Sequence, residues 1–121
     1  MLNRTMDGSM IVFQEGETTV LTVDEKQTDS AIVMALSGEL RSEVANDLYD
    51  ELVALTTVGA NVEVDFSGVT YISSATQHIF LRVQQKMDSM KRGNLLLRNI
   101  PDPIYREFEK TGTAGLLMIE E

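Results

Sequence analysis

The stretch VEVDFSGVTYISSATQH, residues 62–78, contains the pattern that decides the fold. Its first five residues alternate apolar and acidic side chains, and this spacing of two predicts a strand with one buried face. The dipeptide Ser67-Gly68 predicts a turn after that strand. The stretch ends with Ser73-Ser74, directly before a long helical pattern. A core strand therefore leads to two hydroxyl groups at the start of a helix.

The residues that follow predict a helix from Thr76 to Arg92. Basic residues in the last turn and Gly93 directly after it are typical of a helix C-terminus. Apolar residues recur on one face at helical spacing. These are Ile79, Phe80, Val83, Met87 and Met90.

Upstream, residues 18–24 and 31–37 are two apolar, β-branched runs separated by a short polar loop, which predicts a hairpin. The second run is apolar at almost every position, as in a strand buried on both faces. We expect a helix next, with Ser42 as its N-cap and Gly59 closing it. Its apolar stripe consists of Val44, Leu48, Leu52 and Leu55.

Downstream, residues 95–97 predict a short strand. Asp102 is the expected cap of a third helix, with Pro103 in its first turn and Gly112 at its end. Residues 116–119 predict a last short strand or a packed tail.

The alternation of strands and helices after the hairpin predicts an α/β fold, a mixed sheet of about four to five strands with right-handed crossovers. We expect residues 18–121 to form a single domain. Residues 1–17 form a partly ordered N-terminal extension in this interpretation: residues 1–9 are polar and loose, residues 10–13 form an extra edge strand or a docking contact, and residues 14–17 form a turn.

Composition excludes several classes of function. The net charge is −9, which disfavours binding to nucleic acid or to an anionic membrane surface. The chain has no Cys and a single His, so we expect no metal site and no cofactor. No apolar run is long enough to insert into a membrane, and no signal peptide is recognisable, which favours a cytoplasmic location.

An enzyme is the least favoured class. A hydrolytic triad can be written from Ser74, His78 and Asp65, but no nucleophile-elbow sequence surrounds the serine. No nucleotide-binding glycine motif is present either. We therefore expect a protein without catalytic residues.

The pair Ser73-Ser74 has two compatible interpretations. A serine hydroxyl can cap a helix by accepting a hydrogen bond from a free backbone N–H. The same free N–H groups and the helix dipole also favour a phosphate. The sequence therefore indicates either plain capping or a phosphorylation site.

The chain resembles a known family, the STAS domains, which include the bacterial anti-sigma factor antagonists. The resemblance runs from about Thr18 to Ile119 and rests on ALSGEL at residues 35–40 and VDFSGVTYISSA at residues 64–75. It implies a sheet with helices packed on one side. It also implies a regulator of transcription that switches partners when an anti-sigma factor, itself a serine kinase, phosphorylates one serine.

On the family pattern Ser-Ser-Ala-Gly-Leu, the phosphorylated serine corresponds to Ser74. The resemblance also implies a partner-binding surface at Ser73, Thr76, Gln77, His78 and Arg41. Four of these positions depart from the family, because Thr76-Gln77-His78 replaces Gly-Leu-Gly and Arg41 replaces an aspartate that is common there. The alternative is a STAS domain that binds a partner without phosphorylation, as a scaffold or a regulatory subunit, for example of a lipid-transport complex.

Overall fold

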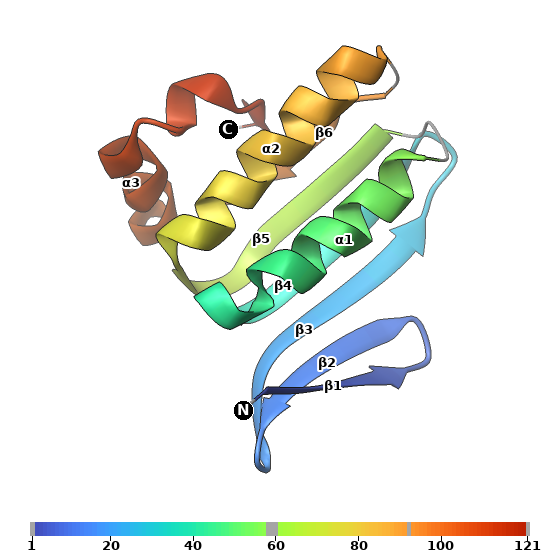
Figure 1. Ribbon diagram of the computed structural model, residues 1–121, viewed down its shortest axis with the longest axis vertical. Helices are drawn as coiled ribbons and strands as arrows, with labels where there is room; N and C mark the ends of the chain where they lie inside the picture. The colour runs from blue at the N-terminus through green and yellow to red at the C-terminus, as the bar shows by residue number, and fades with distance from the viewer. Residues whose placement is uncertain (1, 58–60, 92, 121) are drawn as a thin grey trace.

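The computed structural model describes residues 2–57, 61–91 and 93–120, which form a seven-stranded sheet with three α-helices (Figure 1). The strands are β1 (Leu2–Asp7), β2 (Met10–Glu15), β3 (Thr18–Gln27), β4 (Ala31–Leu40), β5 (Asn61–Ile72), β6 (Leu95–Arg98) and β7 (Ile119–Glu120). The helices are α1 (Ala45–Thr56), α2 (Ser74–Met90) and α3 (Asp102–Thr111), with short 3-10 turns at Ser42–Val44 and Ala114–Leu116.

The strands lie in sequence order across the sheet. Those from β1 to β4 pair antiparallel, and those from β4 to β7 pair parallel, with one helix in each parallel crossover. The predicted mixed α/β sheet is therefore confirmed. It has seven strands and not four to five, because the N-terminal extension adds β1 and β2, and the C-terminal tail adds β7.

The three helices pack on the face of the sheet that carries the predicted apolar alternation. Figure 1 shows α1 and α2 side by side across this face. The ring of Phe66 lies 5.3 Å from that of Phe80 on α2 and 6.0 Å from that of Phe108 on α3. All three rings are fully buried, so one β5 side chain joins two helices to the sheet.

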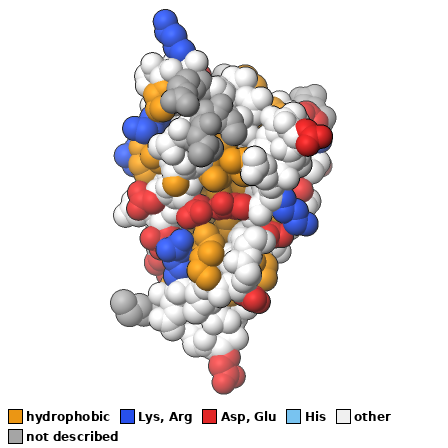
Figure 2. Space-filling view, turned by 90° about the vertical axis from the view of Figure 1, so that its right-hand side faces the viewer, with side chains coloured by type: hydrophobic (Ala, Val, Ile, Leu, Met, Phe, Trp, Pro, Cys, Tyr) orange, Lys and Arg blue, Asp and Glu red, His pale blue; other side chains and the backbone are white. Residues whose placement is uncertain are grey.

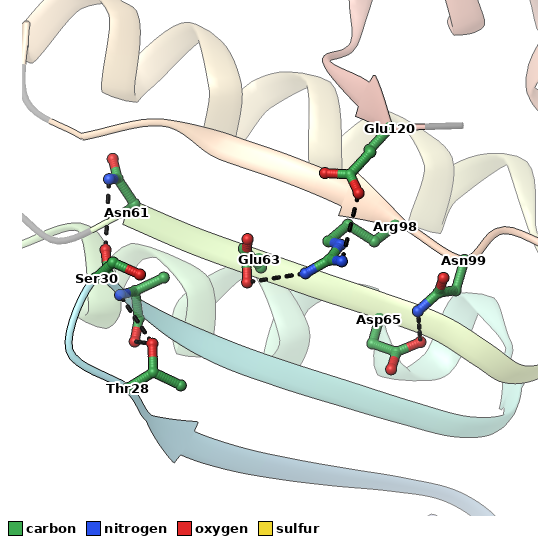
Figure 3. Close-up of polar contacts among 9 residues, drawn as sticks. Thr28, Ser30, Asn61, Glu63, Asp65, Arg98, Asn99 and Glu120 are labelled. Carbon is green, nitrogen blue, oxygen red and sulfur yellow. Dashed lines mark hydrogen bonds and ion pairs between the residues drawn. The ribbon is translucent and has the colours of Figure 1, made fainter.

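The opposite face of the sheet is polar and is joined by ion pairs and hydrogen bonds between strands (Figure 3). Arg98 on β6 lies 3.4 Å from Glu63 on β5 and 3.3 Å from Glu120 on β7. The strand β4 is consequently buried on one face by the helices and only half-buried on the other. The prediction of a strand buried on both faces is wrong.

The N-terminal extension is a hairpin. Residues 2–7 pair with residues 10–15 through the turn at Gly8, whose φ is +63°. Ile11 and Phe13 on β2 are buried in the core, whereas the residues of β1 from 3 to 7 are exposed. The expectation of loose residues 1–9 is therefore wrong for residues 2–7, because an edge strand can be polar and still pair through its backbone.

The prediction of a turn at Ser67-Gly68 is also wrong, because β5 continues to Ile72. The pairing with β4 shifts here instead, from Ala35↔Asp65 to Ser37↔Gly68, so the extra residue forms a bulge. A Cβ on Gly68 would lie 2.9 Å from the Ser37 Cβ and 3.1 Å from the Leu36 carbonyl oxygen. The glycine therefore allows two strands to approach closely.

Two predicted helix caps differ in the structure. Ser42 opens a 3-10 turn whose N-cap is Arg41, and Asp102 lies in the first turn of α3 after Pro101 as N-cap. Gly112 ends α3 with a φ of +78°, as predicted. The predicted roles of Gly59 and Arg92 lie outside the described residues.

Candidate functional site

Ser73 is the N-cap of α2. Its backbone is extended, and its side-chain oxygen accepts a hydrogen bond of 3.1 Å from the Thr76 N–H. Its carbonyl oxygen accepts the N–H of Gln77, and its own N–H donates to the Leu40 carbonyl at the end of β4. The capping role proposed for the serine pair therefore belongs to Ser73.

Thr76 fixes the direction of the Ser73 hydroxyl. The Thr76 oxygen lies 2.9 Å from the Ser73 oxygen, 3.2 Å from the Leu40 carbonyl oxygen and 3.3 Å from the Arg41 carbonyl oxygen. Carbonyl oxygens only accept, so the Thr76 proton is directed to them. The Ser73 proton is then donated to Thr76, and both hydrogen-bonding functions of the Ser73 hydroxyl are used.

Ser74 differs from Ser73 in its position and in the hydrogen bonds of its hydroxyl. It is the first residue of α2, it is exposed, and within residues 2–57, 61–91 and 93–120 no group hydrogen-bonds its hydroxyl. The backbone N–H groups of Ser74 and Ala75 also have no acceptor in that part of the chain. An accessible hydroxyl thus stands beside free donors at the positive end of a 17-residue helix.

The next residues of α2 face in different directions. The side chains of Thr76 and Gln77 are 0% and 2% exposed, and the Gln77 oxygen accepts a 2.7 Å hydrogen bond from the Thr111 hydroxyl on α3. His78 is exposed. The structure therefore differs from the expectation that Thr76 and Gln77 present their side chains on an open surface, since the phase of α2 turns both inward.

The surface around Ser74 has two hollows on either side of Tyr71. One, of about 320 Å³, lies between the end of β5 and α3 and is lined by Ser73, Ser74 and Glu107 among others. The other, of about 300 Å³, is lined by Glu39, Arg41 and residues at the start of the 3-10 turn. Tyr71 lines both, and it is 49% exposed.

Sequence reasoning missed Tyr71. The signal that could have identified it is its place between two buried residues that frame the end of β5, Val69 and Ile72. A large aromatic residue at such a strand end, directly before the serine pair, is a candidate contact residue because tyrosine is enriched at the centres of interfaces.

Arg41 lies in an acidic environment at the same end of the sheet. Its guanidinium is 3.0 Å from the Glu39 carboxylate and 3.4 Å from that of Glu15. The hydrogen bond to Glu39 raises the pKa of Arg41, and the side chain remains charged. The position expected to contact a partner is thus partly exposed, but it is already paired with two glutamates of the chain itself.

The residues of the candidate triad are not brought together. Asp65 points to the polar face of the sheet, away from Phe66 and the helices. Its carboxylate accepts the Ser67 N–H at 2.9 Å. It also accepts the Asn99 amide at 3.2 Å, as Figure 3 shows. Partial burial raises the pKa of Asp65, but these hydrogen bonds outweigh it and leave the pKa below its ordinary value. A structural role explains this carboxylate.

Two kinds of feature are absent from the described part of the chain. No group of three or more His, Asp or Glu side chains there could hold a metal ion. None of its helices has both the length and the apolar character that crossing a bilayer requires.

The family model described as "Mlab, STAS domain" matches residues 23–120. The chain therefore belongs to the STAS domain family, as the sequence resemblance implied. Among curated proteins, the anti-sigma-B factor antagonist of Bacillus subtilis is 29% identical over 99 residues, which cover 82% of this chain and 90% of that protein.

Solved structures of anti-sigma factor antagonists share the fold. An anti-sigma factor antagonist from Mycobacterium paratuberculosis matches with a TM-score of 0.68 at 20% identity, over 82% of this chain and 84% of that one. The Bacillus cell fate determinant SpoIIAA in its phosphorylated form matches with a TM-score of 0.61 at 16% identity, over 82% and 91%. The N-terminal hairpin, residues 2–15, lies before the family match, which begins at residue 23.

Proposed function

We propose that this protein is a non-enzymatic partner-switching regulator of the anti-sigma factor antagonist type. Its unphosphorylated form binds an anti-sigma factor with serine kinase activity, and phosphorylation of Ser74 ends that complex. The observation that carries the proposal is the division of roles between the two serines. The Ser73 hydroxyl is committed to the helix cap, whereas the Ser74 hydroxyl is exposed and without a hydrogen bond in the described residues.

The site suits a phosphate at Ser74. A phosphoserine adds about −1.5 to −2 charges at neutral pH, and the free N–H groups and dipole of α2 favour that charge. The phosphate also extends into the hollow that Ser74 shares with Tyr71 and Glu107. It therefore occupies the space that a docked side chain would fill, and the added charge beside Glu107 opposes any acidic group of a partner.

The docking surface in this proposal consists of the exposed or half-exposed side chains Arg41, Tyr71, Ser73, Ser74 and His78. Tyr71 is the candidate anchor because it is the large apolar group between the two hollows. Thr76 and Gln77 contribute by holding the start of α2 against β4 and α3. Thr76 is a positioning residue, whereas Gln77 also lines the hollow between β5 and α3.

One alternative is supported by a specific observation. The Thr76 hydroxyl holds the Ser73 side chain where the family has glycine, and the matching family model is described as a STAS domain without reference to sigma factors. Both features suit a permanent scaffold or regulatory subunit, for example of a lipid-transport complex. Such a complex would be insensitive to charge at Ser74.

The deciding experiment combines phosphorylation with binding. The parent, Ser74→Ala and Ser73→Ala proteins are incubated with ATP and each anti-sigma factor kinase of the source organism, and the phosphate is located by mass spectrometry of peptides. We expect labelling of the parent and of Ser73→Ala, and none of Ser74→Ala. Equal labelling of Ser74→Ala would refute the site.

Binding measurements then distinguish the partner-switching regulator from the permanent scaffold. We expect Ser74→Asp to bind the anti-sigma factor at least about tenfold more weakly than the parent, a change of about 1.4 kcal/mol. Tyr71→Ala should weaken the complex without affecting which serine is labelled. A tight complex that Ser74→Asp leaves unchanged would support the scaffold.

A further inference from the structure

Gln77 on α2 carries a buried amide of which one end is engaged and the other is not. Its side chain is 2% exposed, and its oxygen accepts the Thr111 hydroxyl at 2.7 Å. Among the described residues, no group accepts a hydrogen bond from its side-chain nitrogen. A buried amide donor without an acceptor is costly, and most buried polar groups have a partner. The free end of this amide therefore indicates a place for an acceptor.

The free end of the amide faces the hollow that contains Ser74. Gln77, Thr111 and Ser74 all line the hollow of about 320 Å³ between β5 and α3. In the described part of the chain, the enclosed side-chain atoms without a partner belong to Glu25 and Arg98, so the Gln77 nitrogen is reached from the hollow. Ser74 and Gln77 are three residues apart on one helix, a spacing at which side chains are neighbours. A group attached to the Ser74 oxygen therefore extends toward the Gln77 nitrogen.

The charges around this hollow allow an anion there. The backbone N–H groups of Ser74 and Ala75 have no acceptor in the described residues, and the helix dipole adds to their positive potential. Glu107 is the acidic side chain that lines the hollow, and Lys110 lies 3.5 Å from its carboxylate. Acidic side chains form a row on the side of β3 and α1, as Figure 2 shows, whereas α2 begins on the opposite side of the molecule in Figure 1.

We propose that Gln77 is a phosphate-binding residue. Its side-chain nitrogen donates a hydrogen bond to the phosphate on Ser74 and, together with the free N–H groups at the start of α2, holds that phosphate in the hollow. The inference rests on the proposed function, because it needs Ser74 to be the phosphorylated residue. The Gln77 oxygen keeps its hydrogen bond with Thr111, so both ends of the amide are then used. The leucine of the family pattern has no such donor.

Binding by Gln77 determines where the phosphate lies. A hydrogen bond to an ionised phosphate is shorter and stronger than one between neutral groups. The phosphate held by this bond occupies the hollow beside Tyr71 and does not extend into solvent. Because Tyr71 is the candidate anchor for the partner, a phosphate fixed beside it blocks docking more effectively than a freely rotating one.

The test uses protein made with phosphoserine incorporated at position 74 during translation, so no kinase is needed. Phosphorus NMR follows the titration of this phosphate in the parent, in Gln77→Leu and in Gln85→Leu. Donors to the dianion lower the pKa of a phosphate from its ordinary value of about 6. We expect this pKa to be at least about 0.5 higher in Gln77→Leu than in the parent, about a threefold change in proton affinity.

Gln85→Leu is the matched control, because it removes an exposed amide from the same helix. The phosphate should titrate in Gln85→Leu as it does in the parent. His78 is exposed beside the site and is present in all the proteins compared, so its own charge does not create a difference between them.

A second readout needs no substitution. The side-chain amide of Gln77 has its own nitrogen and proton NMR signals, and we expect its proton signals to move downfield when position 74 carries phosphoserine in place of serine. Unchanged signals, or an equal phosphate pKa in the parent and Gln77→Leu, overturn the proposal and leave Gln77 as a structural link between α2 and α3.

This outcome is distinguishable from failure of the proposed function. Labelling of Ser74 by a kinase together with an equal phosphate pKa in the parent and Gln77→Leu would reject phosphate binding by Gln77 alone. A higher pKa in Gln77→Leu without labelling of Ser74 by any kinase would support phosphate binding by Gln77 and reject the proposed function.

Discussion

The hydroxyl oxygens of Ser73 and Thr76 lie 2.9 Å apart, and Thr76 is completely buried. The Thr76 hydroxyl also reaches two carbonyl oxygens at the end of β4, those of Leu40 and Arg41. A single methyl-bearing hydroxyl therefore joins the start of α2, the cap and the neighbouring strand. This contact makes Ser73 a structural residue and leaves Ser74 available for chemistry.

Replacing Thr76 with valine should destabilise the protein by about 1–3 kcal/mol, because the shape is retained while carbonyl oxygens in a buried site lose their donor. Urea unfolding followed by circular dichroism measures the change. Thr70→Val is the matched control: Thr70 is exposed and makes one hydrogen bond of 3.3 Å, so its loss should matter by less than about 0.5 kcal/mol. Equal losses of stability in Thr76→Val and Thr70→Val would show that the hydrogen bonds of the Thr76 hydroxyl contribute no stability.

The two serines should differ in stability as well as in phosphorylation. Ser73→Ala removes the cap of α2 and should lower the free energy of unfolding by about 1 kcal/mol. Ser74→Ala removes an exposed hydroxyl and should be nearly neutral, within about 0.5 kcal/mol. The same unfolding assay checks both. A larger loss in Ser74→Ala than in Ser73→Ala would reverse the assignment of roles.

The sequence predicted the central strand and the helices because their apolar residues have a clear period. Val62, Val64 and Phe66 are all buried, and so are Ile79 and Phe80 on α2. It did not predict β1, whose side chains are exposed and whose pairing is made by the backbone. It also could not distinguish a turn from a bulge at Gly68, since the bulge depends on the partner strand.

At the site, the sequence identified the serine pair but not that Ser73 caps the helix while the Ser74 hydroxyl is exposed. The phase of α2 could have indicated that Thr76 is buried, because Thr76 precedes the buried Ile79 by three residues and Phe80 by four. A residue in that register faces the core. The contact between Thr76 and the Leu40 carbonyl could not be predicted, since 36 residues separate the two in sequence.

The lowered pKa of Asp65 predicts that the free energy of unfolding depends on pH in the acid range. Its lowered pKa means that the carboxylate stabilises the fold above the ordinary aspartate pKa of 3.8, and that this stabilisation is lost as the pH falls through the lowered value. Asp65→Asn should therefore be less stable than the parent at neutral pH, and the difference should shrink as the pH falls below the ordinary aspartate pKa of 3.8. Unfolding titrations at several pH values measure it. Asp50→Asn, on the exposed face of α1, removes the same charge and controls for the change in net charge.

Gly38 should be intolerant of any side chain. Its φ is +115°, and a Cβ there would overlap the carbonyl oxygen of Val20 on β3. Because a backbone atom cannot give way as a side chain can, Gly38→Ala should cost about 3 kcal/mol or more, or prevent folding. Gly115→Ala is the control, since a Cβ at that position meets no atom within 4 Å. Thermal unfolding of the two variants should differ widely, and similar midpoints would contradict the close approach of β3 and β4.

Gln84 on α2 should determine whether the C-terminal segment stays on the sheet. Its amide donates to the Leu116 carbonyl at 2.8 Å and accepts the Met118 N–H at 3.1 Å, as a neighbouring strand would. Leu116 and Met118 are 57% and 49% exposed, so apolar burial contributes little to holding these two residues. Leu117 between them is buried in the core, so loss of the amide should loosen the two flanking residues while Leu117 still anchors the segment.

We expect Gln84→Leu to abolish protection of the Met118 amide in hydrogen exchange and to reduce that of Leu97, which donates to the Met118 carbonyl. Gln84→Glu keeps the acceptor but lacks the donor, so its effect should be intermediate at neutral pH and should diminish on acidification, which restores a proton to the side chain. Gln85→Leu, one residue further on and exposed, should leave both amides protected. If Gln85→Leu reduced the protection of the Met118 and Leu97 amides as much as Gln84→Leu does, the helix as a whole and not the Gln84 amide would hold β7.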